Sequence, residues 1–164
     1  ACGDRQTEGR LLNLGGLSFL LGEPEVAVAQ IKEAFAIFLD LGADTDAAQA
    51  VSSLAQVHLR CGAPQLAEEQ ARHALSILGD REDFVDERGN ARLVLGRALH
   101  AQGRTGEAMK EFAQCEWLFE RLGSKSHVAA AWMAQGDVYE TLGDLEASST
   151  LFRRAADALQ DFNF

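Results

Sequence analysis

His58 and Cys61 are the residues best placed to bind a metal, because they stand three positions apart. On a helix, side chains at i and i+3 share a face, and imidazole and thiolate are both zinc ligands. A structural zinc site takes about four such ligands, and no second pair stands at ligand spacing. We therefore expect no metal centre, and we interpret His58 as a histidine packed in the core.

Acid–base chemistry is the next candidate, because two pairs of glutamates stand four residues apart: Glu107 with Glu111, and Glu116 with Glu120. A catalytic carboxylate pair needs burial and two opposed environments, whereas these pairs are expected to form a solvated helix face. The other histidines are scattered: His73, His100 and His127. The chain contains no phosphate-binding loop, nucleophile elbow or dinucleotide fingerprint. The sequence therefore predicts no enzyme and no cofactor.

The cysteines and the net charge limit the compartment in which the protein works and the classes of partner it can bind. Cys2, Cys61 and Cys115 are far apart, which is not a disulfide framework and fits a reducing compartment. The net charge of -10 argues against direct binding of this segment to DNA or RNA, because phosphate backbones repel an acidic surface. No apolar run reaches the length of a membrane span, and no signal peptide opens the chain. We expect a cytoplasmic protein without a membrane partner.

The elements that must position any site come from an internal repeat. Gly22, Gly62, Gly103 and Gly143 follow one another at spacings of 40, 41 and 40 residues. Four further positions recur in register around each glycine. Seven before it stand Gly15, Ala55, Gly96 and Gly136; five after it Ala27, Ala67, Ala108 and Ser148; nine after it Ile31, Ala71, Phe112 and Phe152; twelve after it Ala34, Ala74, Cys115 and Ala155. This register indicates four copies of one unit.

Each unit is predicted to be a helical hairpin turning at its glycine. Trp132, Gln135 and Tyr139 recur at helical spacing, and Gly143 is placed to end that helix in the left-handed conformation. Pro24 and Pro64 lie two residues past their glycines, where the first turn of a helix accepts proline. We expect first helices at about 5–21, 45–61, 83–102 and 126–142, and second helices at about 24–40, 64–78, 105–121 and 145–160. The small residues let the paired helices approach closely, so Cys115 and the tryptophans Trp117 and Trp132 are interpreted as packing residues.

The fourth unit, Trp132, Gln135-Gly136, Tyr139, Gly143, Ser148, Phe152 and Ala155, resembles the tetratricopeptide (TPR) consensus. The resemblance implies an all-α fold, a right-handed α-α superhelix of about four helix-turn-helix repeats and eight helices. It covers one domain, 1–164, with repeats at about 5–42, 45–80, 83–123 and 126–161. The repeat is about six residues longer than the standard ~34. This longer form resembles the sensor regions of bacterial regulators, and we expect a fragment of a longer protein.

In the tetratricopeptide family the first helices line the concave face, which implies a binding surface on this chain. The implied partner-binding residues are Asn13, Phe19, Gln49, Gln56, Arg60, Asn90, Arg97, His100, Met133, Asp137 and Glu140, with Ser52 and Leu93 in the same register. Amides can bond both N–H and C=O of an extended peptide. Arg60 and Arg97 suit a carboxylate or phosphate, or else pair with Asp137 and Glu140.

Three functions remain open at this point. The first is a protein- or peptide-binding module, the regulatory or sensor domain of a bacterial transcription regulator or signalling protein. The second is an assembly module that forms a homodimer through the ends of its solenoid. The third is a small-molecule sensor with its ligand inside the superhelix.

Overall fold

The structure, a computed structural model, describes residues 2–13 and 22–160. These residues form eight α-helices and one 3-10 turn, with no strand among them. The helices are α1 (Cys2–Asn13), α3 (Pro24–Leu41), α4 (Asp44–Arg60), α5 (Pro64–Leu78), α6 (Val85–Ala101), α7 (Thr105–Leu122), α8 (Lys125–Thr141) and α9 (Leu145–Gln160), and the 3-10 turn η1 spans Glu82–Phe84. The predicted all-α fold is confirmed.

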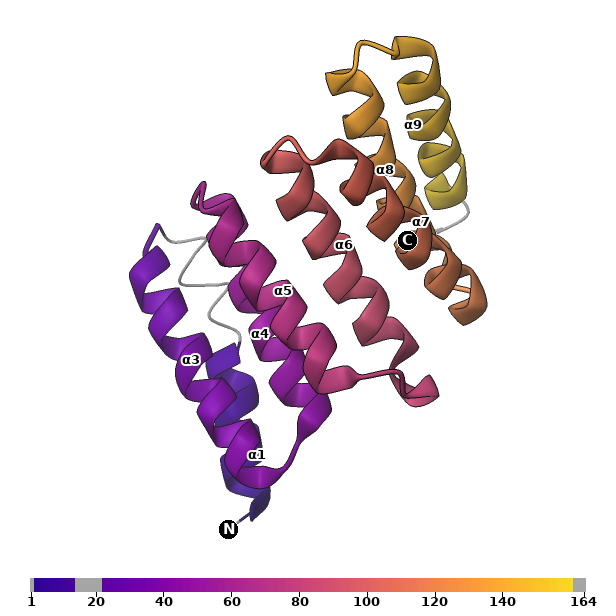
Figure 1. The fold of residues 1–164 in the computed structure, drawn as a ribbon. Coiled ribbons are helices and arrows are strands. Elements are labelled where there is room, and N and C mark those ends of the chain that lie inside the picture. Colours follow the sequence, from indigo (N-terminus) through magenta and orange to yellow (C-terminus); the bar gives the residue numbers. More distant parts are fainter. Residues whose placement is uncertain (1, 14–21, 161–164) are drawn as a thin grey trace.

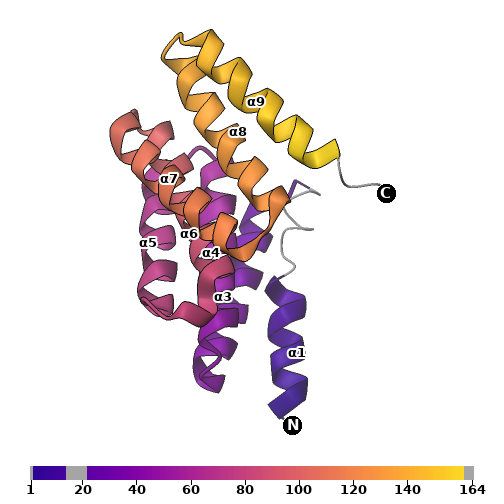
Figure 2. The same cartoon turned by 90° about the vertical axis from the view of Figure 1, so that its right-hand side faces the viewer.

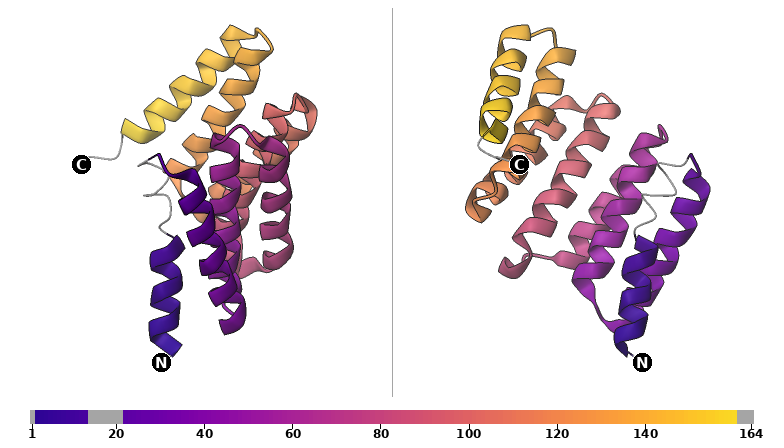
Figure 3. Two further views of the ribbon diagram at one scale, coloured as in Figure 1. Left: turned by 90° about the vertical axis from the view of Figure 1, so that its left-hand side faces the viewer. Right: turned by 180° about the vertical axis from the view of Figure 1, so that it is seen from behind.

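The helices form a two-layer stack of antiparallel hairpins (Figure 1). α4 packs on α5, α6 on α7, and α8 on α9, and α3 packs between α1 and α4. Along the stack α1 contacts α4, α4 contacts α6 and α6 contacts α8. These first helices form an inner layer, and α3, α5, α7 and α9 form the outer layer. Seen from behind, the hairpins follow one another in chain order across the molecule (Figure 3).

Successive hairpins are also rotated, so that α8 and α9 are inclined to α3 and α5 (Figure 2). A stack of rotated hairpins is a solenoid, in which each unit contacts only its neighbours. The inner layer then forms one continuous surface that crosses several units. This surface is where a ligand can touch more than one repeat.

The hairpin turns are set by glycine and proline, as the sequence predicts. Gly143 has φ +81°, a conformation that a side chain disfavours; the glycines in register at positions 22, 62 and 103 share the sign. Pro24 and Pro64 are the first residues of α3 and α5. The turns are therefore short, and the paired helices must run antiparallel.

Two predicted helix boundaries differ from the structure. The helix expected from residue 83 begins at Val85, because Glu82–Phe84 form a 3-10 turn in which the Phe84 N–H donates to the Arg81 carbonyl (3.4 Å). The helix expected over 5–21 begins at Cys2 and is described to Asn13. Its remainder, including Gly15 and Phe19, lies outside the described residues.

The two helices of a hairpin approach through a glycine and a phenylalanine ring. A Cβ at Gly96 would overlap the ring of Phe112, and a Cβ at Gly136 would lie 2.7 Å from Cε1 of Phe152. Phe112 is 1% exposed, so its ring has no space into which to move. The second hairpin places Ala55 and Ala71 at these two positions, and both are fully buried. In this hairpin neither the ring nor the glycine is present.

A second glycine–phenylalanine contact joins the paired helices of a hairpin. A Cβ at Gly89 of α6 would overlap the ring of Phe119 on α7, and a Cβ at Gly9 of α1 would lie 2.7 Å from Cε1 of Phe38 on α3. Phe38 and Phe119 are both fully buried. These glycines thus set the separation of the paired helices within hairpins.

Substituting Gly96→Ala is expected to destabilise the protein by about 1–2 kcal/mol, because overpacking against the Phe112 ring outweighs the gain in helix propensity. The matched control is Gly106→Ala on α7, where an added Cβ meets nothing within 4 Å; it should be neutral or stabilising by up to about 1 kcal/mol. Chemical denaturation measures both. Adding Phe112→Ala should make the glycine substitution cost less, as in the Ala55–Ala71 pair. Equal effects at Gly96 and Gly106 would contradict the packing constraint.

A polar cluster ties the outer helix α5 to the next hairpin. The Glu68 carboxylate accepts hydrogen bonds from Gln102 (2.8 Å), Arg104 (2.8 Å) and Arg72 (2.9 Å), and its side chain is 15% exposed. Desolvation raises the pKa of Glu68, but the hydrogen bonds from Gln102, Arg72 and Arg104 outweigh it and lower the pKa to about 2. The carboxylate is therefore more stable as an anion in the folded chain than in the unfolded one.

The stabilisation from Glu68 is expected to be complete above its unfolded pKa of about 4.5 and to be lost as the pH falls towards about 2. Glu68→Gln should lower the free energy of unfolding at pH 7 by about 1–2 kcal/mol, and by less at pH 3. Glu69→Gln, an exposed neighbour on α5, is the control. Denaturation at both pH values measures the difference; a Glu68→Gln effect that does not change with pH would exclude this role.

Candidate functional site

The inner layer carries a polar cleft between α4 and α6, with a volume of about 340 Å³. Its lining comes from two helices only: Gln49, Ser52, Ser53 and Gln56 of α4, and Asp86, Glu87 and Asn90 of α6. The four α4 residues stand at i, i+3, i+4 and i+7, which places them on one helix face. The opposite face of α4 buries Val51, Leu54 and Ala55. Packing of the apolar face therefore turns the polar stripe into the cleft.

The cleft has unused hydrogen-bonding capacity. Gln49 Nε2 donates to Glu87 Oε1 at 3.4 Å, and Asn90 Nδ2 donates to Asp86 Oδ1 at 3.1 Å. The side chain of Ser52 is only 8% exposed, yet its hydroxyl has no hydrogen-bond partner among the described residues. Buried polar groups in proteins are normally paired. The cleft can therefore accept and donate further hydrogen bonds to a ligand.

The structure brings four of the residues predicted by register together in the cleft: Gln49, Ser52, Gln56 and Asn90. Four more lie on exposed positions of α6 and α8: Arg97, Met133, Asp137 and Glu140. Arg60 is exposed at the end of α4. Leu93, expected in the same register, is 7% exposed and belongs to the core, which corrects its assignment to the surface. The side chain of Asn13 and all of Phe19 lie outside the described residues.

His100 is half-buried between α6 and α8. Its Nε2 lies 3.3 Å from the Thr141 hydroxyl, and its Nδ1 is buried without a partner in the described part of the chain. Arg97, on the same helix, forms no ion pair with Asp137 or Glu140. Neither residue lines the cleft.

Sequence reasoning missed Ser53, Asp86 and Glu87. Glu87 stands one helical turn before Asn90, so the register contained a signal for it. Asp86 and Ser53 lie beside positions in the stripe, and only the approach of α4 to α6 places them in the lining. The family consensus gives only one lining position per helical turn. A cleft formed between two helices also takes in neighbouring positions, which such a consensus does not list.

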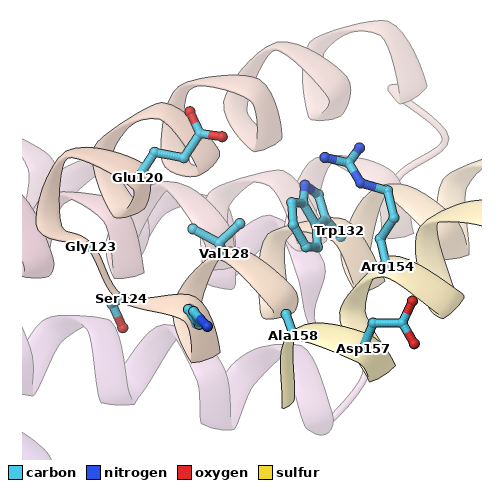
Figure 4. Close-up of a pocket in the computed structure, with 9 residues that line it drawn as sticks. Glu120, Gly123, Ser124, Val128, Trp132, Arg154, Asp157 and Ala158 are labelled. Carbon is cyan, nitrogen blue, oxygen red and sulfur yellow. The ribbon is translucent and has the colours of Figure 1, made fainter. Parts of the chain in front are cut away.

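A second cavity, of about 520 Å³, lies between α7 and α9 over α8 (Figure 4). The Arg154 guanidinium stands 4.1 Å from the centre of the Trp132 ring, and Val128 and Ala158 supply apolar lining. Trp132 Nε1 donates to Glu116 at 2.6 Å. This cavity belongs to the outer layer of the last hairpin, away from the inner-layer cleft.

Three interpretations from the sequence need correction. Glu116 is not on a solvated face: it accepts hydrogen bonds from Trp132 and from Gln135 (2.7 Å). Glu111 likewise pairs with Arg92 at 2.7 Å, because that position faces the paired helix α6. Trp117 is 56% exposed on the outer layer, stacked only by Arg121. Its indole is therefore not a core residue.

Metal and thiol chemistry are limited within the described residues, where no group of three or more His, Cys, Asp or Glu side chains is placed to hold a metal ion. Burial, together with the charge of Lys32, lowers the pKa of His58. Burial raises the pKa of Cys115 to about 12, and its side chain is fully buried, which confirms the packing role. Cys61 is exposed at the end of α4. None of the described helices combines the length and apolarity required to cross a bilayer.

With the geometry established, the chain can be compared with known proteins. Residues 129–158 match the tetratricopeptide repeat family (TPR_8). The matched segment holds Trp132, Gly136 and Phe152, the residues on which the resemblance rests. The match therefore supports the predicted tetratricopeptide resemblance in the fourth repeat, where the sequence follows the consensus most completely. No curated protein matches the sequence.

Solved structures share the fold over nearly the whole chain. The crystal structure of MamA superposes with a TM-score of 0.62 at 20% identity, covering 92% of this chain and 77% of MamA. A second MamA structure gives 0.51 at 16% identity, covering 99% and 97%. The apo form of RapI gives 0.72 at 15% identity, covering 94% of this chain but only 43% of RapI. At these identities the comparison establishes the tetratricopeptide-like solenoid and nothing about ligands.

The two described free thiols are expected to differ in reactivity. Because Cys115 is buried and its pKa is about 12, it should remain unalkylated in the native protein, whereas Cys61 should react like an ordinary exposed thiol. Iodoacetamide labelling of a Cys2→Ser variant at pH 7.5, followed by mass spectrometry, measures both sites. Labelling in denaturant is the control and should modify both. Equal native rates would show that the α7 packing opens readily.

Proposed function

We propose that this protein binds an extended segment of a partner protein along its inner layer, with the α4–α6 cleft at the centre. The observation that carries the proposal is the cleft itself. Its lining consists of polar side chains, and the hydroxyl of Ser52 and the amide of Gln56 have no hydrogen-bond partner among the described residues. Glutamine and asparagine amides can pair with both N–H and C=O of a peptide backbone. The tetratricopeptide match and the solenoid fold support a protein-interaction module over an enzyme.

We further propose a regulatory role, as the sensor or regulatory domain of a bacterial transcription regulator or signalling protein in the cytoplasm. The forty-residue repeat period supports this assignment, together with the acidic net charge of -10. In this proposal the chain is a single domain of a longer protein. Capture of the partner segment, rather than contact with DNA, is then its contribution.

A peptide array screened with the purified protein tests the binding function. Replacing Gln56 and Asn90 together by alanine should weaken binding of the selected peptides by at least about tenfold, which corresponds to about 1.4 kcal/mol. The control is Gln65→Ala with Gln114→Ala, two exposed amides of the outer layer. If the Gln56 and Asn90 variant binds every peptide as tightly as the control does, the cleft is not the binding site.

Assembly through the last hairpin is a second candidate, and one observation favours it. Leu159 stands sixteen residues after Gly143, and the counterparts of Leu159 in the other hairpins, Phe38, Leu78 and Phe119, are fully buried. Leu159 itself is 40% exposed. We infer that a second copy of the chain covers this position. Light scattering across a concentration series should then show a dimer that Leu159→Gln dissociates; a strict monomer at every concentration excludes it.

A further inference from the structure

We propose that the α4–α6 cleft seats a lysine or arginine side chain of the bound segment, held by Asp86 and Glu87. This inference rests on the proposed function, because it names the chemistry of the partner that the same cleft selects. It commits to a cationic side chain within a polypeptide. Three features carry it: the charges of the lining, one hydroxyl without a partner among the described residues, and the arrangement of the two walls.

The lining of the cleft contains two carboxylates and no lysine or arginine. The nearest basic group to Asp86 is His127, whose Nδ1 lies 3.8 Å from Oδ1 and also 2.7 Å from the Ser124 hydroxyl. Within the part of the chain that the structure describes, Glu87 has one hydrogen bond, the long one from Gln49 at 3.4 Å. Other carboxylates pair with arginine, as Glu82 does at 2.6 Å and Glu111 at 2.7 Å. Among the described residues, therefore, neither cleft carboxylate is paired with a lysine or an arginine.

The second observation is Ser52 on the opposite wall. Its side chain is more than nine-tenths buried, it lines the cleft, and its hydroxyl makes no hydrogen bond within the described residues. Ser53, its neighbour, donates to the Gln49 carbonyl (3.0 Å) and so shows the pairing that Ser52 does not make. Because Ser52 lines the cleft, its hydroxyl is open to a partner that enters there. A lysine ammonium has three donors and a guanidinium has five, and either can reach both walls.

The arrangement of the walls fits a side chain entering between them. Asp86 and Glu87 lie on the first turn of α6, whereas Ser52 and Gln56 lie on α4. The cleft volume of about 340 Å³ is at the lower end of the range for ligand pockets, ~300–1,000 Å³. It therefore accommodates one long side chain better than a whole cofactor. The net charge of -10 also attracts a basic segment over longer distances and repels an acidic one.

Two other occupants fit less well. A bound metal ion would need more ligands than the cleft offers, since no group of three suitable side chains occurs in the described part of the chain. An acidic side chain would place a third carboxylate against Asp86 and Glu87, which costs several kcal/mol for close like charges. A free amine such as a polyamine shares the chemistry of lysine, and the experiment must separate it from a peptide.

The test is a random peptide library panned on the purified protein, followed by fluorescence anisotropy of the selected peptides. We expect one lysine or arginine to be enriched at a fixed position. Replacing that residue by glutamine, or using the Glu87→Gln variant, should each weaken binding about tenfold, and the two changes combined should be no worse than either alone. Glu87→Lys should reverse the preference and favour a glutamate at that position. Glu69→Lys, on the exposed face of α5, is the matched charge control and should leave affinity unchanged.

Each outcome decides one of the two claims. Peptides that are sensitive to the Gln56 and Asn90 substitutions but contain no enriched basic residue, and that ignore Glu87→Gln, overturn the cationic seat and leave the proposed function standing. Peptides insensitive to the Gln56 and Asn90 substitutions overturn both. Spermidine that displaces the labelled peptide at a similar concentration to the peptide itself overturns the peptide seat in favour of a small amine. Thermal denaturation of every variant should match the parent protein, and the double-substitution comparison remains informative if Glu87→Lys alone fails to fold.

Discussion

The close approach of a phenylalanine ring to a glycine Cα is the contact on which the stack depends. Phe112 over Gly96, Phe119 over Gly89 and Phe152 over Gly136 each set the separation of the two helices within a hairpin. Interiors this tightly packed transmit a change of one methyl group to their neighbours. A hairpin whose helices stood farther apart would present a different surface to the next hairpin. The geometry of the inner layer, including the cleft, is thus a consequence of ring-on-glycine packing.

The second hairpin has the same backbone arrangement but packs its paired helices with different residues. With Ala55 and Ala71 at the paired positions, neither ring nor glycine is present, yet both residues are fully buried. The smaller core of this hairpin is accompanied by the polar cluster around Glu68, which ties α5 to the turn before α7 through Gln102 and Arg104. Hydrogen bonds to a shielded carboxylate and apolar packing contribute to the same junction. The repeats are equivalent in geometry without being equivalent in chemistry.

Because the small residues required by packing recur about every forty residues, the fold could be predicted from the sequence. Seven of the predicted helices agree with the structure to within about two residues, and Gly143, Pro24 and Cys115 take the expected roles. The residues of the candidate site could be predicted only in part. Gln49, Gln56 and Asn90 follow from register, but Asp86 and Ser53 enter the cleft through the angle between two helices. Leu93 and Glu116 were misassigned for the same reason: a helical period gives a direction for a side chain, not what the neighbouring helix places there.

This division follows from the way in which a solenoid uses its two faces. Positions such as Gly96 face another helix, so they are restricted to small residues, and their pattern is visible as a repeat. Positions such as Ser52 and Glu87 face the open side of the inner layer, where packing imposes no repeat and the residue type can follow a ligand. The equivalents of Glu87 in the neighbouring first helices are Asp46, which is paired with Arg10, and His127, which stacks on Phe119. Glu87, which pairs with no lysine or arginine among the described residues, is therefore a departure from the repeat at this register position, and a departure on the open face is a position where the residue type can follow a ligand rather than packing.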